Sequence, residues 1–231
     1  MSLSLYGYDL QPAVDLVVKG GPVAIILVAL SVVATTVMLV KVSRFLWLRL
    51  GARSRVERAL ALWFGARESD AIALLNGARQ PAAQVLAGAM RGTHAGHDDR
   101  LVRKDVERLA IGKIAQLRSH LRILDVTVQA APLLGLFGTV IGMISAFQAL
   151  QTAGADADPA VLAGGIWVAL TTTALGLAVA LPIAFVNAWL DGRVEAEQRV
   201  MEDAVTSLLT GRVSARAPLR TPREEDGNAT G

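Results

Sequence analysis

The sequence predicts an all-α integral membrane protein with three transmembrane helices, of which the second and third extend into the cytoplasm as long helices. The chain has 231 residues, of which 53% are hydrophobic and 19% are charged. Three stretches contain no charged residue, and they lie between Lys19 and Lys41, between Asp125 and Asp156, and between Asp158 and Asp191. Each is longer than the roughly 20 apolar residues that cross a bilayer core as a helix. None alternates as a barrel strand does, and so short a chain has too little polar sequence to bury three such helices in a soluble fold.

The expected elements follow these stretches in chain order. We expect a periplasmic N-terminal tail (residues 1–20), a first transmembrane helix (21–43), a cytoplasmic helical region (44–123), a second transmembrane helix (124–150), a periplasmic loop (151–160), a third transmembrane helix (161–190), a cytoplasmic helix extension (191–211) and a disordered tail (212–231). The N-terminal tail holds Asp9 and Asp15 and lacks the basic start of a secretory signal.

Lysine and arginine residues predict the orientation in the membrane. Of the 23 in the chain, only Lys19 lies outside the segments from Lys41 to Arg122 and from Arg193 to Arg223. Because cytoplasmic segments carry the excess of positive charge, we expect both segments in the cytoplasm and the N-terminus in the periplasm. The net charge of +3 then reflects topology and contact with membrane lipids, and no nucleic acid partner is expected. The chain has no cysteine, which excludes disulfides and thiolate metal ligands.

Apolar periodicity predicts that the second and third spans continue as cytoplasmic helices. One apolar face precedes the second span and consists of Val106, Ala110, Ile114, Leu117, Leu121, Leu124 and Val128. No proline occurs from Asp98 until Pro132, so we expect one uninterrupted helix to enter the membrane. Beyond the third span a similar face continues to Gly211, where a glycine C-cap is expected to end the helix. Charged residues, Glu197 among them, occupy most other positions of that extension.

Small side chains form a stripe along each of the last two spans. The second span contributes Gly135, Gly138, Thr139, Gly142, Ser145 and Ala149, and the third contributes Gly165, Ala169, Thr172, Thr173, Gly176 and Ala180. Small residues let helices approach closely in lipid, so helix packing is one interpretation. The other is that Thr139 and Thr173 face a common cavity that holds water or a partner's polar group. Pro132 and Pro182 are expected to bend their helices and free backbone carbonyls nearby.

The spans themselves contain no ionisable residue, because the aspartates that bound them lie at their edges. A proton relay requires a titratable group within the membrane. If the protein moves protons, another chain must therefore supply the carboxylate. The histidines His94, His97 and His120 lack further ligands at a suitable spacing, and no nucleophile–base set is evident. We expect no metal, no cofactor and no enzymatic activity.

Two segments, "APLLGLFGTVIGMISAF" and "GGIWVALTTTALGLAVALP", resemble the MotA/TolQ/ExbB proton-channel family. The resemblance is closest to the ExbB branch, and the TolQ branch is the second closest. The resemblance is close over residues 131–187 and loose elsewhere. It implies a multi-pass protein of the bacterial inner membrane that forms a homo-oligomeric ring, pentameric in the ExbB type. The ring encloses an ExbD- or TolR-like single-span partner, which supplies a transmembrane aspartate. Proton passage at that aspartate drives movement of a TonB- or TolA-like protein.

The candidate site combines the stripes with this resemblance. The family's two motif threonines match Thr139 and Thr173, which implies that these line a pore, and Thr172 stands beside the second of them. The helix-packing candidates are Gly135, Gly138, Gly142, Gly176, Pro132 and Pro182. The family's glutamate, five residues before the third-span threonine, is replaced by Val168 here, which weakens any role of this chain itself in binding protons.

The expected function is that of an ExbB-like subunit that uses the proton-motive force to energise TonB-dependent outer-membrane transport. One alternative is a TolQ-like subunit of the Tol envelope-integrity system. Another is a structural membrane scaffold without ion coupling. A solute transporter is disfavoured because the sequence shows neither an inverted repeat nor polar substrate-binding groups at mid-membrane.

Overall fold

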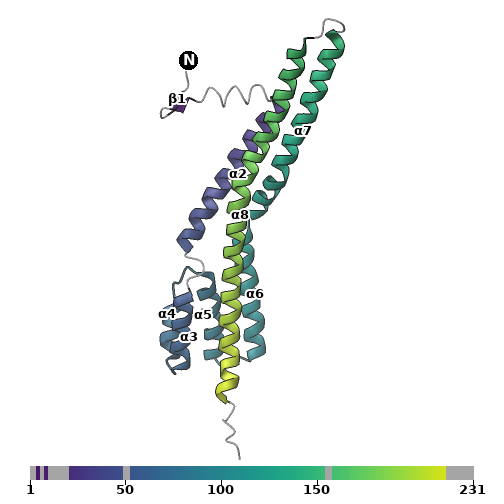
Figure 1. Cartoon of the computed structure of the whole chain (residues 1–231). Coiled ribbons are helices and arrows are strands. Elements are labelled where there is room, and N and C mark those ends of the chain that lie inside the picture. Colours follow the sequence, from purple (N-terminus) through teal and green to yellow (C-terminus); the bar gives the residue numbers. More distant parts are fainter. Residues whose placement is uncertain (1–3, 6–7, 10–20, 49–52, 154–157, 217–231) are drawn as a thin grey trace, which may run out of the picture. The chain divides into compact units, whose positions relative to one another are not determined.

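The computed structural model describes residues 4–5, 8–9, 21–48, 53–153 and 158–216. Within them the chain is helical apart from short turns between the helices and two antiparallel two-residue strands, β1 (Ser4–Leu5) and β2 (Tyr8–Asp9). The helices are α2 (Gly21–Leu48), α3 (Arg53–Phe64), α4 (Glu68–Leu75), α5 (Pro81–His94), α6 (Asp99–Arg118), α7 (Leu121–Ala153) and α8 (Pro159–Arg216) (Figure 1). The predicted all-α class is confirmed.

Helices α2, α7 and α8 are each long and apolar enough to cross a membrane. Their surfaces carry large apolar side chains that the described residues leave exposed, such as Trp167 (67% exposed) and Phe185 (76% exposed). A contiguous surface of this kind is unfavourable in water and suits lipid or another membrane helix. The three charge-free stretches of the sequence therefore correspond to three membrane-crossing helices, as predicted.

The chain folds into two compact units. The first combines Met1–Trp47 with Arg118–Gly192, and the second combines Leu48–Leu117 with Arg193–Gly231. Helix α8 contributes its earlier part to the first unit and its later part to the second.

In the first unit, α2 packs on the pair formed by α7 and α8. Val23 and Leu27 of α2 join Ala131 of α7 and Ala180 of α8 in a buried cluster. Helices α7 and α8 lie side by side and run in opposite directions (Figure 1). The small size of the two alanines allows α2 to approach both helices at once.

The second unit is built around α5, which begins with Pro81 at its first turn, where the fixed φ of proline favours helix formation. Leu86 and Met90 of α5 are fully buried in a core with Trp63 of α3 and Leu208 of α8. The exposed faces of α3 and of the later part of α8 carry charged residues such as Arg58 and Arg199, so these helices are amphipathic and bury their apolar sides in this core.

Glu197 was expected on the polar face of α8, and that expectation is wrong. The residue is 2% exposed, and its Oε1 accepts a hydrogen bond of 2.9 Å from the backbone N–H of Ala82 in the first turn of α5. The first backbone N–H groups of a helix have no partner within the helix. A carboxylate that satisfies one of them can therefore lie inside the core.

The helix ahead of the second span is interrupted, contrary to the expectation of a single helix. Helix α6 ends at Arg118, and α7 begins at Leu121. Between them His120 has a φ of 65°, a left-handed conformation that a right-handed helix cannot contain. Leu117 and Leu121 are both buried, so the apolar spacing continues across the break and does not reveal it.

Helix α8 continues to Arg216, past the Gly211 at which we expected a C-cap. Gly211 lies against the ring of Phe64, and a Cβ placed on it would be 2.5 Å from Cζ of that ring. This glycine lies within α8, and its lack of a side chain leaves room for the aromatic ring that packs against the helix. Most of the expected N-terminal tail, residues 154–157 of the expected loop and residues 217–231 of the expected C-terminal tail lie outside the described residues.

Candidate functional site

The residues singled out in the second and third spans lie along the contact between α7 and α8. We name this contact the α7–α8 seam, and it consists of Ala131, Gly135, Gly138, Gly142 and Ala146 of α7 with Gly165, Ala169, Thr172, Gly176 and Ala180 of α8. Each helix presents a small residue at every third or fourth position. This spacing keeps all of them on one helix face.

The two backbones approach so closely that several seam positions have no room for a side chain. A Cβ on Gly176 would lie 2.5 Å from the carbonyl oxygen of Ala131, and a Cβ on Gly138 would lie 2.6 Å from Oγ1 of Thr172. Both distances are shorter than a carbon atom can tolerate, so glycine is required at these two positions. In lipid, such close packing is what holds helices together.

The seam is similarly tight toward the end of α7. A Cβ on Gly142 would lie 3.1 Å from Cβ of Ala169, and a Cβ on Gly165 would collide with Cβ of Ala146. The predicted packing glycines of α7 and Gly176 of α8 therefore each lie against the opposite helix within one copy of the chain.

The two adjacent threonines of α8 differ in their hydrogen bonds. Thr172 is 2% exposed, and its Oγ1 donates to the carbonyl oxygen of Ala169 at 2.7 Å. Thr173 faces Gly135, whose Cβ would lie 3.0 Å from Cα of Thr173. The Oγ1 atom of Thr173 is buried and has no hydrogen-bond partner among the described residues. An unpaired buried hydroxyl costs about 1–3 kcal/mol, so this group can gain from a water or an incoming polar atom.

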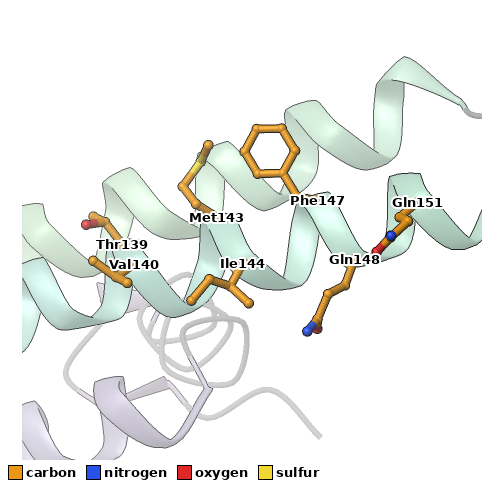
Figure 2. Close-up of a pocket in the computed structure, with 7 residues that line it drawn as sticks. All are labelled: Thr139, Val140, Met143, Ile144, Phe147, Gln148 and Gln151. Carbon is orange, nitrogen blue, oxygen red and sulfur yellow. The ribbon is translucent and has the colours of Figure 1, made fainter.

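Thr139 lies outside the seam. It lines an open groove on α7 together with Val140, Met143, Ile144, Phe147, Gln148 and Gln151 (Figure 2). Its Oγ1 donates to the carbonyl oxygen of Leu136 at 2.6 Å. Thr173 is not among the residues that line this groove. A cavity common to both threonines would therefore need surfaces from further chains.

The two prolines named as helix-packing candidates lie inside α7 and α8, and neither ends its helix. Proline has no N–H to donate, so Pro132 and Pro182 leave the carbonyl groups of Val128 and Ala178, four residues earlier, without their usual helical partners.

Val168 lines a second groove, which it shares with seam residues such as Gly138, Gly142 and Gly165 and with the start of α2. The lining of this groove contains no titratable side chain. The position at which the family resemblance implies a glutamate is therefore apolar together with its surroundings.

Two polar contacts in the first unit were not predicted from the sequence. Asn187 of α8 is 7% exposed, and its Nδ2 donates to Oδ1 of Asp125 on α7 at 2.6 Å. Lys41 of α2 is 4% exposed, and its Nζ donates to Oγ of Ser119 at 3.3 Å. The burial of Asn187 could have been predicted from the sequence, because this residue continues the spacing of the seam residues beyond Ala180. Lys41 carried no such signal, since it is also the first charge after a membrane span.

The described residues contain no group of three or more His, Cys, Asp or Glu side chains that could hold a metal ion. Nδ1 of His94 lies 2.6 Å from Oε2 of Glu68, and Nδ1 of His97 lies 3.2 Å from the carbonyl oxygen of Gly92. These histidines make contacts of an ordinary structural kind.

Comparison with known proteins bears on the same segments. The sequence pattern of the MotA/TolQ/ExbB proton channel family matches residues 77–203, which is more than half of the chain. This range includes the whole α7–α8 seam, Thr139 and Thr173.

Individual relatives carry ExbB and TolQ names. The chain is 36% identical over 119 residues to a biopolymer transport protein ExbB homolog of Methanothermobacter thermautotrophicus, a match that covers 52% of this chain and 41% of the relative. It is 42% identical over 66 residues to the biopolymer transport protein ExbB of Helicobacter pylori, covering 29% and 45% of the two chains. It is 34% identical over 109 residues to the Tol-Pal system protein TolQ of Haemophilus influenzae, covering 46% and 47%. Each match spans less than half of the relative's length.

The family match, the ExbB and TolQ relatives and the three apolar helices agree with one another, and they describe a multi-pass inner-membrane protein of a transport family. The chain belongs to the MotA/TolQ/ExbB proton channel family.

Proposed function

We propose that the chain is an ExbB-like subunit of an inner-membrane motor complex driven by the proton-motive force. Several copies form a ring, pentameric as in the ExbB type, around the transmembrane helix of an ExbD-like partner. The N-terminus lies in the periplasm, and the basic segments lie in the cytoplasm, in agreement with the distribution of Lys and Arg. The complex energises TonB-dependent transport across the outer membrane.

The observation that carries this proposal is the buried Oγ1 of Thr173, which has no partner among the described residues. In an apolar helix pair, a hydroxyl with no partner among the described residues is suited to a polar group from elsewhere. A carboxyl group on a partner helix, or a water bound to it, would meet that requirement once it has access to this atom, which is buried in the single chain. Thr139, on the open groove of α7, offers a second hydroxyl to the same partner.

The absence of a titratable side chain around Val168 supports assigning the proton-carrying group to the partner. Movement of one charge through a potential of 100 mV releases about 2.3 kcal/mol. With the partner's carboxyl as the titrating group, the threonine hydroxyls of the ring would solvate it while it is neutral and while it is charged.

The test is proton uptake into liposomes that contain the chain together with its single-span partner. Thr139→Ala and Thr173→Ala are expected to reduce uptake strongly without changing the number of subunits counted by native mass spectrometry. Thr36→Ala is the matched control, because Thr36 lies in α2 and its hydroxyl donates to the carbonyl of Val32. Unchanged uptake in both threonine variants would leave the structural scaffold as the better account.

The TolQ-like alternative is supported by the relative of that name. Complementation separates the two roles. Restored outer-membrane uptake in cells that lack ExbB supports the ExbB-like role, whereas restored detergent resistance in cells that lack TolQ supports the other.

A further inference from the structure

The small residues of the seam do not by themselves define how α7 aligns with α8. From Ala131 to Ala146 the seam residues of α7 are spaced 4, 3, 4 and 4 positions apart, and those of α8 from Gly165 to Ala180 are spaced 4, 3, 4 and 4 positions apart as well. If α7 slid along α8 by one helical turn, about 5.4 Å, small residues would again face small residues. Close packing therefore distinguishes poorly between the two alignments.

A polar residue continues the row of seam positions on α8. Beyond Ala180 the spacing runs through Ile183 (3% exposed), Asn187 (7%) and Leu190 (0%). Asn187 is thus the one amide in a row whose other members, from Gly165 to Leu190, are small or apolar apart from Thr172. Its Nδ2 donates to Oδ1 of Asp125 on α7 at 2.6 Å.

This hydrogen bond is a poor source of stability. The Oδ1 atom of Asn187 is buried and has no partner among the described residues, so the one hydrogen bond of this amide comes with the cost of an unpaired buried oxygen. A buried polar group of this kind favours one alignment over others, as a single asparagine does in the core of a coiled coil.

We propose that the hydrogen bond between Asn187 and Asp125 sets the register of α7 against α8, which makes both of them positioning residues for the seam. A shift by one turn would separate Asn187 from Asp125. It would also move Thr173 away from Gly135, the residue it faces in the observed alignment.

One competing alignment has a specific polar contact. Gln129 follows Asp125 by one turn on α7, so a slide of one turn would bring Gln129 to Asn187. The resulting amide–amide hydrogen bond would be neutral, whereas the bond to the Asp125 carboxylate is charge-assisted and about twice as strong. Loss of Asp125 is therefore expected to favour the alignment with Gln129.

Cysteine cross-linking can measure the register, because the natural chain has no cysteine. Gly142→Cys with Ala169→Cys reports the observed alignment, in which a Cβ on Gly142 would lie 3.1 Å from Cβ of Ala169. Ala146→Cys with Ala169→Cys reports the alignment shifted by one turn. The full-length chain is oxidised in membranes, the monomer is isolated to exclude links between copies, and the two disulfides are quantified by mass spectrometry.

Four further changes are introduced, each separately, into both cysteine-pair variants. Asp125→Ala and Asn187→Leu remove the hydrogen bond, and the double change Asp125→Asn with Asn187→Asp reverses its partners. Asp158→Ala is the control, because Asp158 is exposed and its Oδ1 accepts from the backbone N–H of Ala160 at the start of α8, away from the seam.

We expect the ratio of shifted to native disulfide to rise several-fold in Asp125→Ala and in Asn187→Leu. In the reversed pair the ratio is expected to return to its value without further changes, and in Asp158→Ala it is expected to stay at that value. An unchanged ratio in both single variants overturns the proposal. So does the loss of both disulfides, because the bond would then hold the helices together rather than select their alignment, and so does a reversed pair that fails to restore the native ratio. Cross-linking measures no transport, so each result is independent of the proposed function.

Discussion

The backbone N–H of Ala82 donates a hydrogen bond of 2.9 Å to Oε1 of Glu197, a side chain that α8 buries almost completely against the first turn of α5. A negative charge near a helix N-terminus is stabilised by the unpaired N–H groups and by the helix dipole. The contact joins residues 115 positions apart and fixes α5 to α8 within the second unit.

Glu197→Ala is expected to lower the free energy of unfolding of the second unit by about 1.5–3 kcal/mol, the usual contribution of a hydrogen bond to a charged group. Glu197→Gln keeps an acceptor oxygen and is expected to lose less. Urea unfolding in detergent, followed by circular dichroism, measures both. The matched control is Glu195→Ala. The carboxylate of Glu195 is 58% exposed and lies 3.7 Å from Nη1 of Arg199. Equal losses at Glu195 and Glu197 would contradict the capping role.

Gly176→Ala is expected to separate α7 from α8, because a Cβ at this position would lie 2.5 Å from the carbonyl oxygen of Ala131. Overpacking of this kind costs about 1–3 kcal/mol. Gly164→Ala on the same helix is the control, because nothing lies within 4 Å of a Cβ there. Alanine favours a helix over glycine by up to about 1 kcal/mol, so the control is expected to be neutral or stabilising. Thermal unfolding in detergent separates the two, and a stabilising Gly176→Ala would refute the tight seam.

Ala66→Gly is expected to stabilise the second unit by about 1 kcal/mol. Ala66 has a φ of 61°, and the left-handed conformation costs a residue with a Cβ about 1–2 kcal/mol, which glycine avoids. Ala95→Gly is the control, since Ala95 has a φ of −72° and gains no such relief. The measurement is the shift in unfolding midpoint, and a destabilising Ala66→Gly would show that the turn between α3 and α4 is not strained.

Thr173→Val is expected to abolish proton uptake while leaving the unfolding free energy unchanged or raising it by up to about 1–3 kcal/mol, because a buried hydroxyl without a partner is removed. Thr172→Val removes a hydrogen bond to Ala169 and is expected to lower that free energy by about 1 kcal/mol. Stability and uptake are measured on the same preparations. A Thr173→Val protein that unfolds more easily would indicate that its hydroxyl has a structural partner.

The three spans could be predicted because charges are excluded from the apolar core of a bilayer, and Lys41, Asp125 and Asp191 therefore mark the span edges in the sequence itself. The two stripes of small residues could also be recognised, because a helix repeats its face every three or four residues. Those stripes led directly to Gly138 and Gly176, which lie in the seam.

What the sequence did not reveal depends on contacts between distant residues or on single backbone angles. The burial of Glu197 requires the start of α5, far away in the chain, and the charged residues Arg193, Glu195 and Arg199 stand near it in the sequence. The break at His120 rests on one φ value that leaves the apolar spacing intact. Gly211 resembled a C-cap because glycine often ends helices. In the structure, the glycine instead leaves space for the ring of Phe64. The separate surroundings of Thr139 and Thr173 likewise follow from the packing of α7 on α8.

The near contact of Gly176 with Ala131 has a consequence for leakage. A file of water molecules needs a passage about 2.8 Å wide, and the two backbones leave no such width where these residues meet. A solitary copy in a bilayer is therefore an electrical insulator along the line where α7 touches α8. The proton path of the proposed motor is therefore expected where separate chains meet.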